Sequence, residues 1–131
     1  MGKYMLLVVD DSHMMREFIK AAITESFPSV EVYDASNGKE AQQKLEAARF
    51  DVVLCDWEMP EMSGSDLLKW VRSTPPVKDI PFIMVTAKRE KESILDAINT
   101  GVTDYIVKPL NAEVLCQKLT AVLRRLNQKS Q

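Results

Sequence analysis

Short apolar runs alternate with amphipathic segments along the chain. The runs predict β-strands at residues 4–9, 30–34, 51–56, 80–86 and 104–108. The segments that follow them have apolar residues at helical spacing and predict helices at 13–26, 38–48, 64–73, 90–99 and 111–127. Strands that alternate with helices through short joints are typical of a parallel sheet with helices on both faces. The pattern therefore predicts an α/β fold of five βα units.

The predicted helices are flanked by residue types that are typical of helix termini. Ser12 is a good N-cap for the first helix, and Pro28 closes that helix. Asn111 with Glu113 predicts the start of the last helix. Gly101 follows the fourth helix at a position that favours a left-handed residue. These signals support the predicted boundaries.

The last predicted helix has a single apolar stripe. Its members recur at helical spacing: Leu115, Leu119, Val122 and Leu126. Such a stripe indicates packing against a core; it also fits a heptad, but the segment is too short for a free coiled coil. Between the third helix and the fourth strand, Thr74, Pro75 and Pro76 predict a loop and not a domain boundary.

Polar residues stand at the carboxyl ends of four of the five apolar runs. They are Asp10 and Asp11, Asp56, Thr86, which Ala87 follows, and Lys108, which Pro109 follows. In an open parallel α/β sheet, the carboxyl ends of the strands line one crevice, and ligands bind there. We therefore expect these residues, although far apart in the sequence, to meet in one pocket.

Three carboxylates in this pocket require a compensating charge. At about 4 Å, a like-charge pair costs from about 1 kcal/mol in water to about 4 kcal/mol at an effective dielectric near 20. A hard divalent ion with oxygen ligands is the expected answer, and Mg²⁺ is the first candidate cofactor for Asp10, Asp11 and Asp56. Taken alone, an acidic pair at a strand end also fits a helix cap or a solvent-facing site. The other polar residues of the set favour the metal site.

The same residues suit phosphoryl transfer. A carboxylate beside Mg²⁺ can itself act as a nucleophile and form an aspartyl phosphate, as in certain ATPases. The Lys108 ammonium is expected to reach a phosphoryl oxygen and complete a clamp. The Thr86 hydroxyl and the Ala87 backbone N–H offer two further donors.

Composition narrows the class of protein. The 131 residues fit a single domain, 1–131, with a core at 4–127. A net charge of −2, with 17 basic and 19 acidic residues mixed along the chain, gives no basic run for nucleic acid or anionic lipid. The first apolar run is far short of a membrane span, so we expect a cytoplasmic protein without a membrane partner. Cys55 is interpreted as a small buried hydrophobe and His13 as a partly exposed residue of the first helical turn.

Four stretches give the chain a family resemblance: LLVVDDS at 6–12, DWEMPEMSG at 56–64, FIMVTA at 82–87 and DYIVKP at 104–109. As a set they resemble the receiver domain of two-component response regulators, most closely the stand-alone chemotaxis regulators. The resemblance implies a flavodoxin-like, doubly wound sheet of strand order 2-1-3-4-5. It also implies a phosphorelay switch that catalyses only its own phosphorylation and dephosphorylation, with a sensor histidine kinase or a phosphotransfer protein as donor.

The resemblance assigns roles to the polar residues. Asp56 corresponds to the phosphoacceptor, Asp11, Asp56 and the backbone carbonyl of Glu58 to the Mg²⁺ ligands, and Asp10 to a residue that acts through water. Thr86 and Tyr105 correspond to the switch pair. The signal is expected to leave through the face formed by 90–99, 104–108 and 111–127, toward a downstream protein. The expected state is a monomer or a weak dimer that depends on phosphorylation.

One pair of residues departs from the chemotaxis pattern. Glu58 stands where those regulators have an amide, and Lys88 lies two residues after Thr86. By the resemblance both flank the path of the attacking water. We expect their opposite charges to pair there and screen that path; the alternative is that an unpaired Glu58 orients the water and shortens the lifetime of the phosphoryl group. An exposed pair is worth about 0–1 kcal/mol, so its effect is expected on the lifetime of the phosphoryl group.

Three other interpretations stay open. A haloacid-dehalogenase-like phosphatase also uses an Mg²⁺-bound aspartate, although its nucleophile normally ends the first strand. A flavodoxin-type binding module needs a phosphate loop that the sequence lacks. A third possibility is the receiver domain of a longer regulator.

Overall fold

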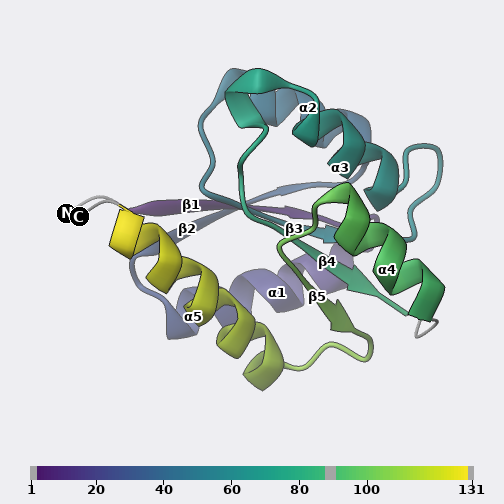
Figure 1. Cartoon of the computed structure of the whole chain (residues 1–131). Helices are drawn as coiled ribbons and strands as arrows, with labels where there is room; N and C mark the ends of the chain where they lie inside the picture. The colour runs from purple at the N-terminus through teal and green to yellow at the C-terminus, as the bar shows by residue number, and fades with distance from the viewer. Residues whose placement is uncertain (1–2, 88–90, 130–131) are drawn as a thin grey trace.

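The computed structural model describes residues 3–87 and 91–129. Within them, one five-stranded parallel sheet has the order β2-β1-β3-β4-β5, which confirms the predicted doubly wound fold (Figure 1). The strands are β1 (Tyr4–Val9), β2 (Val30–Ala35), β3 (Val52–Asp56), β4 (Phe82–Thr86) and β5 (Asp104–Val107). The helices are α1 (His13–Ser26), α2 (Gly38–Ala47), α3 (Gly64–Arg72), α4 (Lys91–Thr100) and α5 (Ala112–Lys129).

Helices cover both faces of the sheet. Figure 1 shows α2 and α3 on one side, with α4 beside α3, and α1 and α5 on the other. One apolar cluster joins Ala41 and Leu45 of α2 to Leu67 of α3. The other joins Ile19 of α1 to Leu115 of α5, together with Leu119 and Val122 of the predicted stripe. The stripe therefore packs against the core as predicted.

The central strands β3 and β4 are apolar up to their last residue because both of their faces are covered. All five residues of β3 and all five of β4 are buried, whereas the edge strands β2 and β5 have partly exposed positions. In the register of the ladder, Asp56 lies opposite Val85, and Thr86 lies opposite Val107. This register brings the polar residues at the strand ends to one edge of the sheet.

The helix ends follow the predicted signals. Ser12 accepts a hydrogen bond from the Met15 N–H at 3.2 Å, and Asn111 accepts one from the Val114 N–H at 2.8 Å. Gly101 has a φ of 109°, the conformation that the end of α4 requires. None of the helices in the described ranges combines the length and the apolar composition that a bilayer span requires.

The structure differs from the prediction in two segments, for identifiable reasons. The segment predicted as a plain loop contains a short 3₁₀ helix, Pro75–Val77, because proline has the φ that begins a helical turn. The strand predicted at 80–86 begins at Phe82. Pro81 has no N–H to donate to the ladder. The remaining boundaries lie within two residues of the prediction wherever the residues are described.

Gly64 is the residue on which the loop after β3 depends. A Cβ at this position would lie 2.7 Å from the backbone oxygen of Asp56 and 2.8 Å from Cα of Trp57. Neither atom can move without displacing the end of β3. At Gly38 the nearest atom to a Cβ would be Met62 Sδ, at 2.6 Å, which is the far end of a flexible side chain.

We therefore expect Gly64→Ala to lower the free energy of unfolding by about 1–3 kcal/mol, as overpacking typically does. Gly38→Ala is the matched control and should lower it less, because Met62 can adopt another rotamer. Urea denaturation of the two variants and the parent measures both values. If the two variants lose the same free energy of unfolding, the close backbone approach at Gly64 is not what the loop depends on.

Candidate functional site

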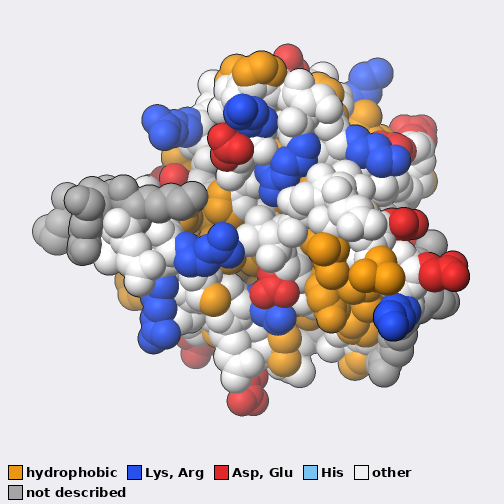
Figure 2. Space-filling view, viewed as in Figure 1, with side chains coloured by type: hydrophobic (Ala, Val, Ile, Leu, Met, Phe, Trp, Pro, Cys, Tyr) orange, Lys and Arg blue, Asp and Glu red, His pale blue; other side chains and the backbone are white. Residues whose placement is uncertain are grey.

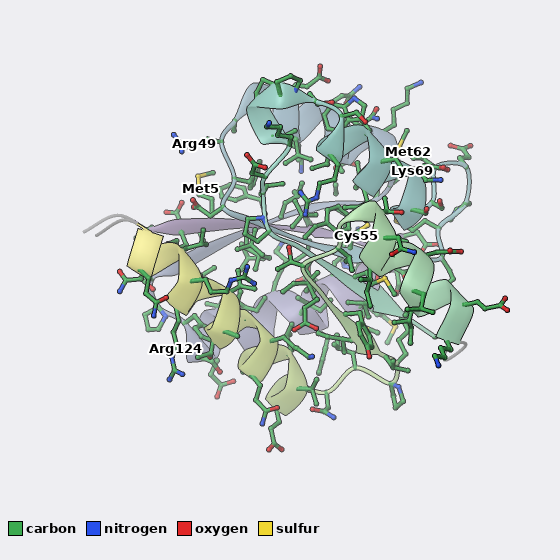
Figure 3. The ribbon with its side chains drawn as sticks, in the orientation of Figure 1. Met5, Arg49, Cys55, Met62, Lys69 and Arg124 are labelled. Carbon is green, nitrogen blue, oxygen red and sulfur yellow. The ribbon has the colours of Figure 1, made fainter. Side chains whose placement is uncertain are left out.

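The polar residues meet at the carboxyl edge of the sheet. Asp10 follows β1, Asp56 ends β3, Thr86 ends β4 and Lys108 follows β5. In Figure 1 the strands run from the side where the two chain termini lie to the opposite side, so that their carboxyl ends lie together. Figure 3 labels Cys55, the residue before Asp56, among the strands in the interior; its side chain is fully buried, as predicted.

Three carboxylates form a cluster that suits a hard cation. Asp10, Asp11 and Asp56 each offer one oxygen, and these oxygens lie within 4.8 Å of one another. Asp10 and Asp56 are both only 4% exposed, whereas Asp11 faces solvent. An all-oxygen donor set that is open to water on one side fits Mg²⁺, which keeps several waters when it binds to proteins.

Asp10 is held in place by Ser12, the N-cap of α1, and by Arg16 on α1. Its Oδ1 accepts a hydrogen bond from the Ser12 N–H at 2.8 Å. Arg16 donates from Nη1 to the Asp10 carbonyl at 2.7 Å and from Nε to Asp34 Oδ2 at 3.0 Å. Burial raises the pKa of Asp10, and the Ser12 hydrogen bond opposes that rise. The role of Arg16 could not be predicted from the sequence, because a helical arginine has no feature that marks its partner.

Asp56 is paired with the lysine that the sequence predicted would face it. Lys108 Nζ donates to Asp56 Oδ1 at 3.0 Å, and the peptide bond from Lys108 to Pro109 is cis. Burial raises the pKa of Asp56 to about 6, although the hydrogen bond from Lys108 acts in the opposite direction. Burial lowers the pKa of Lys108, but the bond to Asp56 and the nearby carboxylates outweigh it, so the pKa is raised overall.

Glu58 makes contacts that the sequence did not predict. Its Oε1 accepts a hydrogen bond from the Thr86 hydroxyl at 2.5 Å, and its Oε2 accepts one from the Ala87 N–H at 3.4 Å. These are the two donors at the end of β4 that were expected to meet a phosphoryl group. The predicted partner of Glu58, Lys88, lies outside the described residues.

Tyr105 lies half-buried in β5, next to a cation from α5. Lys118 Nζ lies 5.7 Å from the centre of the Tyr105 ring and 3.0 Å from Asp104 Oδ1. On α4, Leu95 and Ile98 are 45% and 49% exposed. Figure 2 shows hydrophobic side chains gathered over the region where Figure 1 draws α4 and β5. Hydrophobic side chains thus form an exposed patch over α4 and β5, with charged side chains around it.

Residues 6–120 match the sequence profile of the response regulator receiver domain. The chain belongs to the response regulator receiver family. The resemblance inferred from the four sequence stretches is therefore confirmed, and with it the interpretation as a signalling domain over the phosphatase and the flavodoxin-type module.

Relatives of this receiver domain cover almost its whole length. Chemotaxis protein CheY1 of Helicobacter pylori is 46% identical over 119 residues, which are 90% of this chain and 95% of that protein. Chemotaxis protein CheY of Pseudomonas aeruginosa is 37% identical over 122 residues, or 93% and 98% of the two chains. The structure of the chemotaxis response regulator CheY4 of Vibrio cholerae superposes with a TM-score of 0.85 at 34% identity, covering 92% of this chain and 99% of that one.

The raised pKa of Asp56 predicts a pH dependence of stability for the metal-free receiver domain. The carboxyl group takes up its proton more readily in the folded chain, with a pKa of about 6 against an ordinary 3.8. Its contribution to stability is therefore fully present below pH 3.8 and is lost as the pH rises through about 6. The expected loss is on the order of 3 kcal/mol, because a difference of one pKa unit corresponds to about 1.4 kcal/mol.

Urea denaturation in EDTA across this pH range, with Asp56→Asn as the reference, measures the contribution. The free energy of unfolding of the parent relative to Asp56→Asn should fall as the pH rises. If the difference in free energy of unfolding between the parent and Asp56→Asn stays constant with pH, Asp56 has the same pKa in the folded and the unfolded chain.

Proposed function

We propose that this receiver domain works in a phosphorelay and accepts a phosphoryl group on Asp56 from a sensor histidine kinase or a phosphotransfer protein. The observation that carries the proposal is the position of the Asp56 carboxylate. It is almost fully buried, it lies against the Lys108 ammonium at 3.0 Å, and it shares a cluster with Asp10 and Asp11. A carboxylate in that setting is held at one orientation with a cation beside it.

In the proposed reaction, an Asp56 carboxylate oxygen forms a bond to phosphorus while the bond from phosphorus to the donor's leaving group breaks. Lys108 stays protonated and donates a hydrogen bond to an oxygen of the transferred group. Asp10, Asp11, Asp56 and the backbone carbonyl of Glu58 are the groups that would hold Mg²⁺. When bound, Mg²⁺ supplies positive charge that offsets the charge on the transferring phosphoryl group.

The proposed switch begins at the end of β4. A phosphoryl group on Asp56 brings roughly −1.5 to −2 charges, and the Thr86 hydroxyl and the Ala87 N–H are proposed as donors to its oxygens. The movement of Thr86 then changes the packing of Tyr105. Moving a two-state equilibrium from 1:99 to 99:1 needs about 5.5 kcal/mol, which is the scale of a few charge-assisted hydrogen bonds.

The proposed output surface is the face formed by α4, β5 and α5. Its support is the exposed apolar pair Leu95 and Ile98 on α4 and the half-buried Tyr105 on β5. The named relatives are chemotaxis proteins. We therefore propose a chemotaxis or flagellar-motor protein as the downstream partner, and a cytoplasmic location for the exchange.

Acetyl phosphate with Mg²⁺ should add one phosphoryl group to Asp56, because the reactive carboxylate and its cation are already in place. Mass spectrometry of the intact chain detects the added mass, and fragmentation locates it. Asp56→Asn should remove the modification. Asp51→Asn, at a half-buried carboxylate before the start of β3, is the control and should leave it unchanged. Modification of Asp56→Asn with the parent's yield would contradict the assignment.

Asp11→Ala should weaken Mg²⁺ binding more than Asp10→Ala, because a direct ligand contributes more than one that acts through water. Trp57 is adjacent to Asp56 in the sequence, so its fluorescence reports on the metal. A titration with Mg²⁺ in each variant gives the affinities. If Asp11→Ala binds Mg²⁺ as the parent does, the proposed ligand set is incorrect.

A further inference from the structure

The Glu58 carboxylate already has both of the hydrogen bonds that a phosphoryl group would need at the end of β4. Its two oxygens accept from two different donors, Oε1 from the Thr86 hydroxyl at 2.5 Å and Oε2 from the Ala87 N–H at 3.4 Å. Thr86 is completely buried, so its hydroxyl has little freedom to turn to water instead. Glu58 therefore occupies this end of the pocket in the way that two oxygens of a phosphoryl group would.

Both donors have a single proton to offer. A threonine hydroxyl donates one hydrogen bond, and so does a backbone N–H. While Thr86 and Ala87 donate to Glu58, they do not donate with full strength to an oxygen on Asp56. Glu58 and a phosphoryl group thus compete for the same two protons.

Repulsion between the Glu58 carboxylate and a phosphoryl group strengthens this competition. Glu58 carries a negative charge close to Asp56, and it acts to raise the pKa of both Asp56 and Lys108. A phosphoryl group on Asp56 would carry roughly −1.5 to −2 charges in place of the single charge of the carboxylate. The two anions repel each other, so the Glu58 side chain leaves the pocket when the phosphoryl group enters it. Its half-exposed position gives it room to turn outward.

We propose that the Glu58 side chain is a built-in competitor for the phosphoryl group: it holds the Thr86 and Ala87 donors in the unmodified protein and must be displaced before they bind phosphoryl oxygens. This inference rests on the proposed function of Asp56. It makes Glu58 a positioning residue that sets how readily the receiver domain accepts and keeps its phosphoryl group. Its action differs from the predicted pairing with Lys88, since it works through Thr86.

The test measures the dissociation constant of beryllium trifluoride, a phosphoryl mimic, in the presence of Mg²⁺ by ¹⁹F NMR on the full chain. Glu58→Ala removes the competitor, and Glu58→Gln keeps its shape without its charge. Each is also made in the Thr86→Ala and Thr86→Ser backgrounds, which remove and retain the hydroxyl. Glu61→Gln neutralises an exposed carboxylate of the same loop and serves as the matched control.

Glu58→Ala should tighten binding about tenfold, which is the scale of one charge-assisted hydrogen bond, and Glu58→Gln should give a smaller gain. In the Thr86→Ala background the gain should shrink to about threefold or less, because the contested hydroxyl is gone. In the Thr86→Ser background it should return. Glu61→Gln should bind as the parent does.

Three results would overturn the inference. If the parent binds the mimic and the Glu58 variants bind it equally well, Glu58 is no competitor, while the proposed function stands. If the gain is the same with and without the Thr86 hydroxyl, the effect is one of charge alone and the competition is disproved. If neither the parent nor any variant gives a bound fluoride signal, the proposed function fails and the inference fails with it.

Discussion

The repulsion among carboxylates at one edge of the sheet is the constraint on which the rest of the structure depends. Asp10 and Asp56 are almost fully buried and have Asp11 beside them, and burial raises the pKa of both buried groups. In the described chain, the cation that faces Asp56 is Lys108, from the far end of the sequence. The site therefore exists only where β1, β3 and β5 end at the same edge.

The fold meets this constraint with a rigid support. The central strands are buried on both faces. The register of the ladder between them fixes the positions of Asp56 and Thr86 at the edge of the sheet. Arg16 ties the backbone of Asp10 to β2 through Asp34. Gly64 lets the loop after β3 pass close to the Asp56 backbone. Packing energy from two apolar clusters thus holds together charges that would otherwise separate.

The sequence predicted the parts of the molecule that depend on local pattern. Continuous apolar runs marked the strands, cap residues such as Ser12 marked the helix ends, and the position of Asp10, Asp56 and Lys108 after strands predicted their meeting. The contacts of Glu58 and Arg16 could not be predicted in this way. Each depends on the direction of a long flexible side chain, which the surrounding fold decides and the spacing of residues does not.

The most direct test of the account is the crystal structure of the chain with Mg²⁺ and beryllium trifluoride. The account predicts the mimic on a carboxylate oxygen of Asp56, with Lys108 Nζ and the Thr86 hydroxyl donating to its fluorines and the Glu58 side chain turned away from Thr86. A mimic bound at another residue, or one bound at Asp56 while Lys108 and Thr86 keep their present partners, would contradict it.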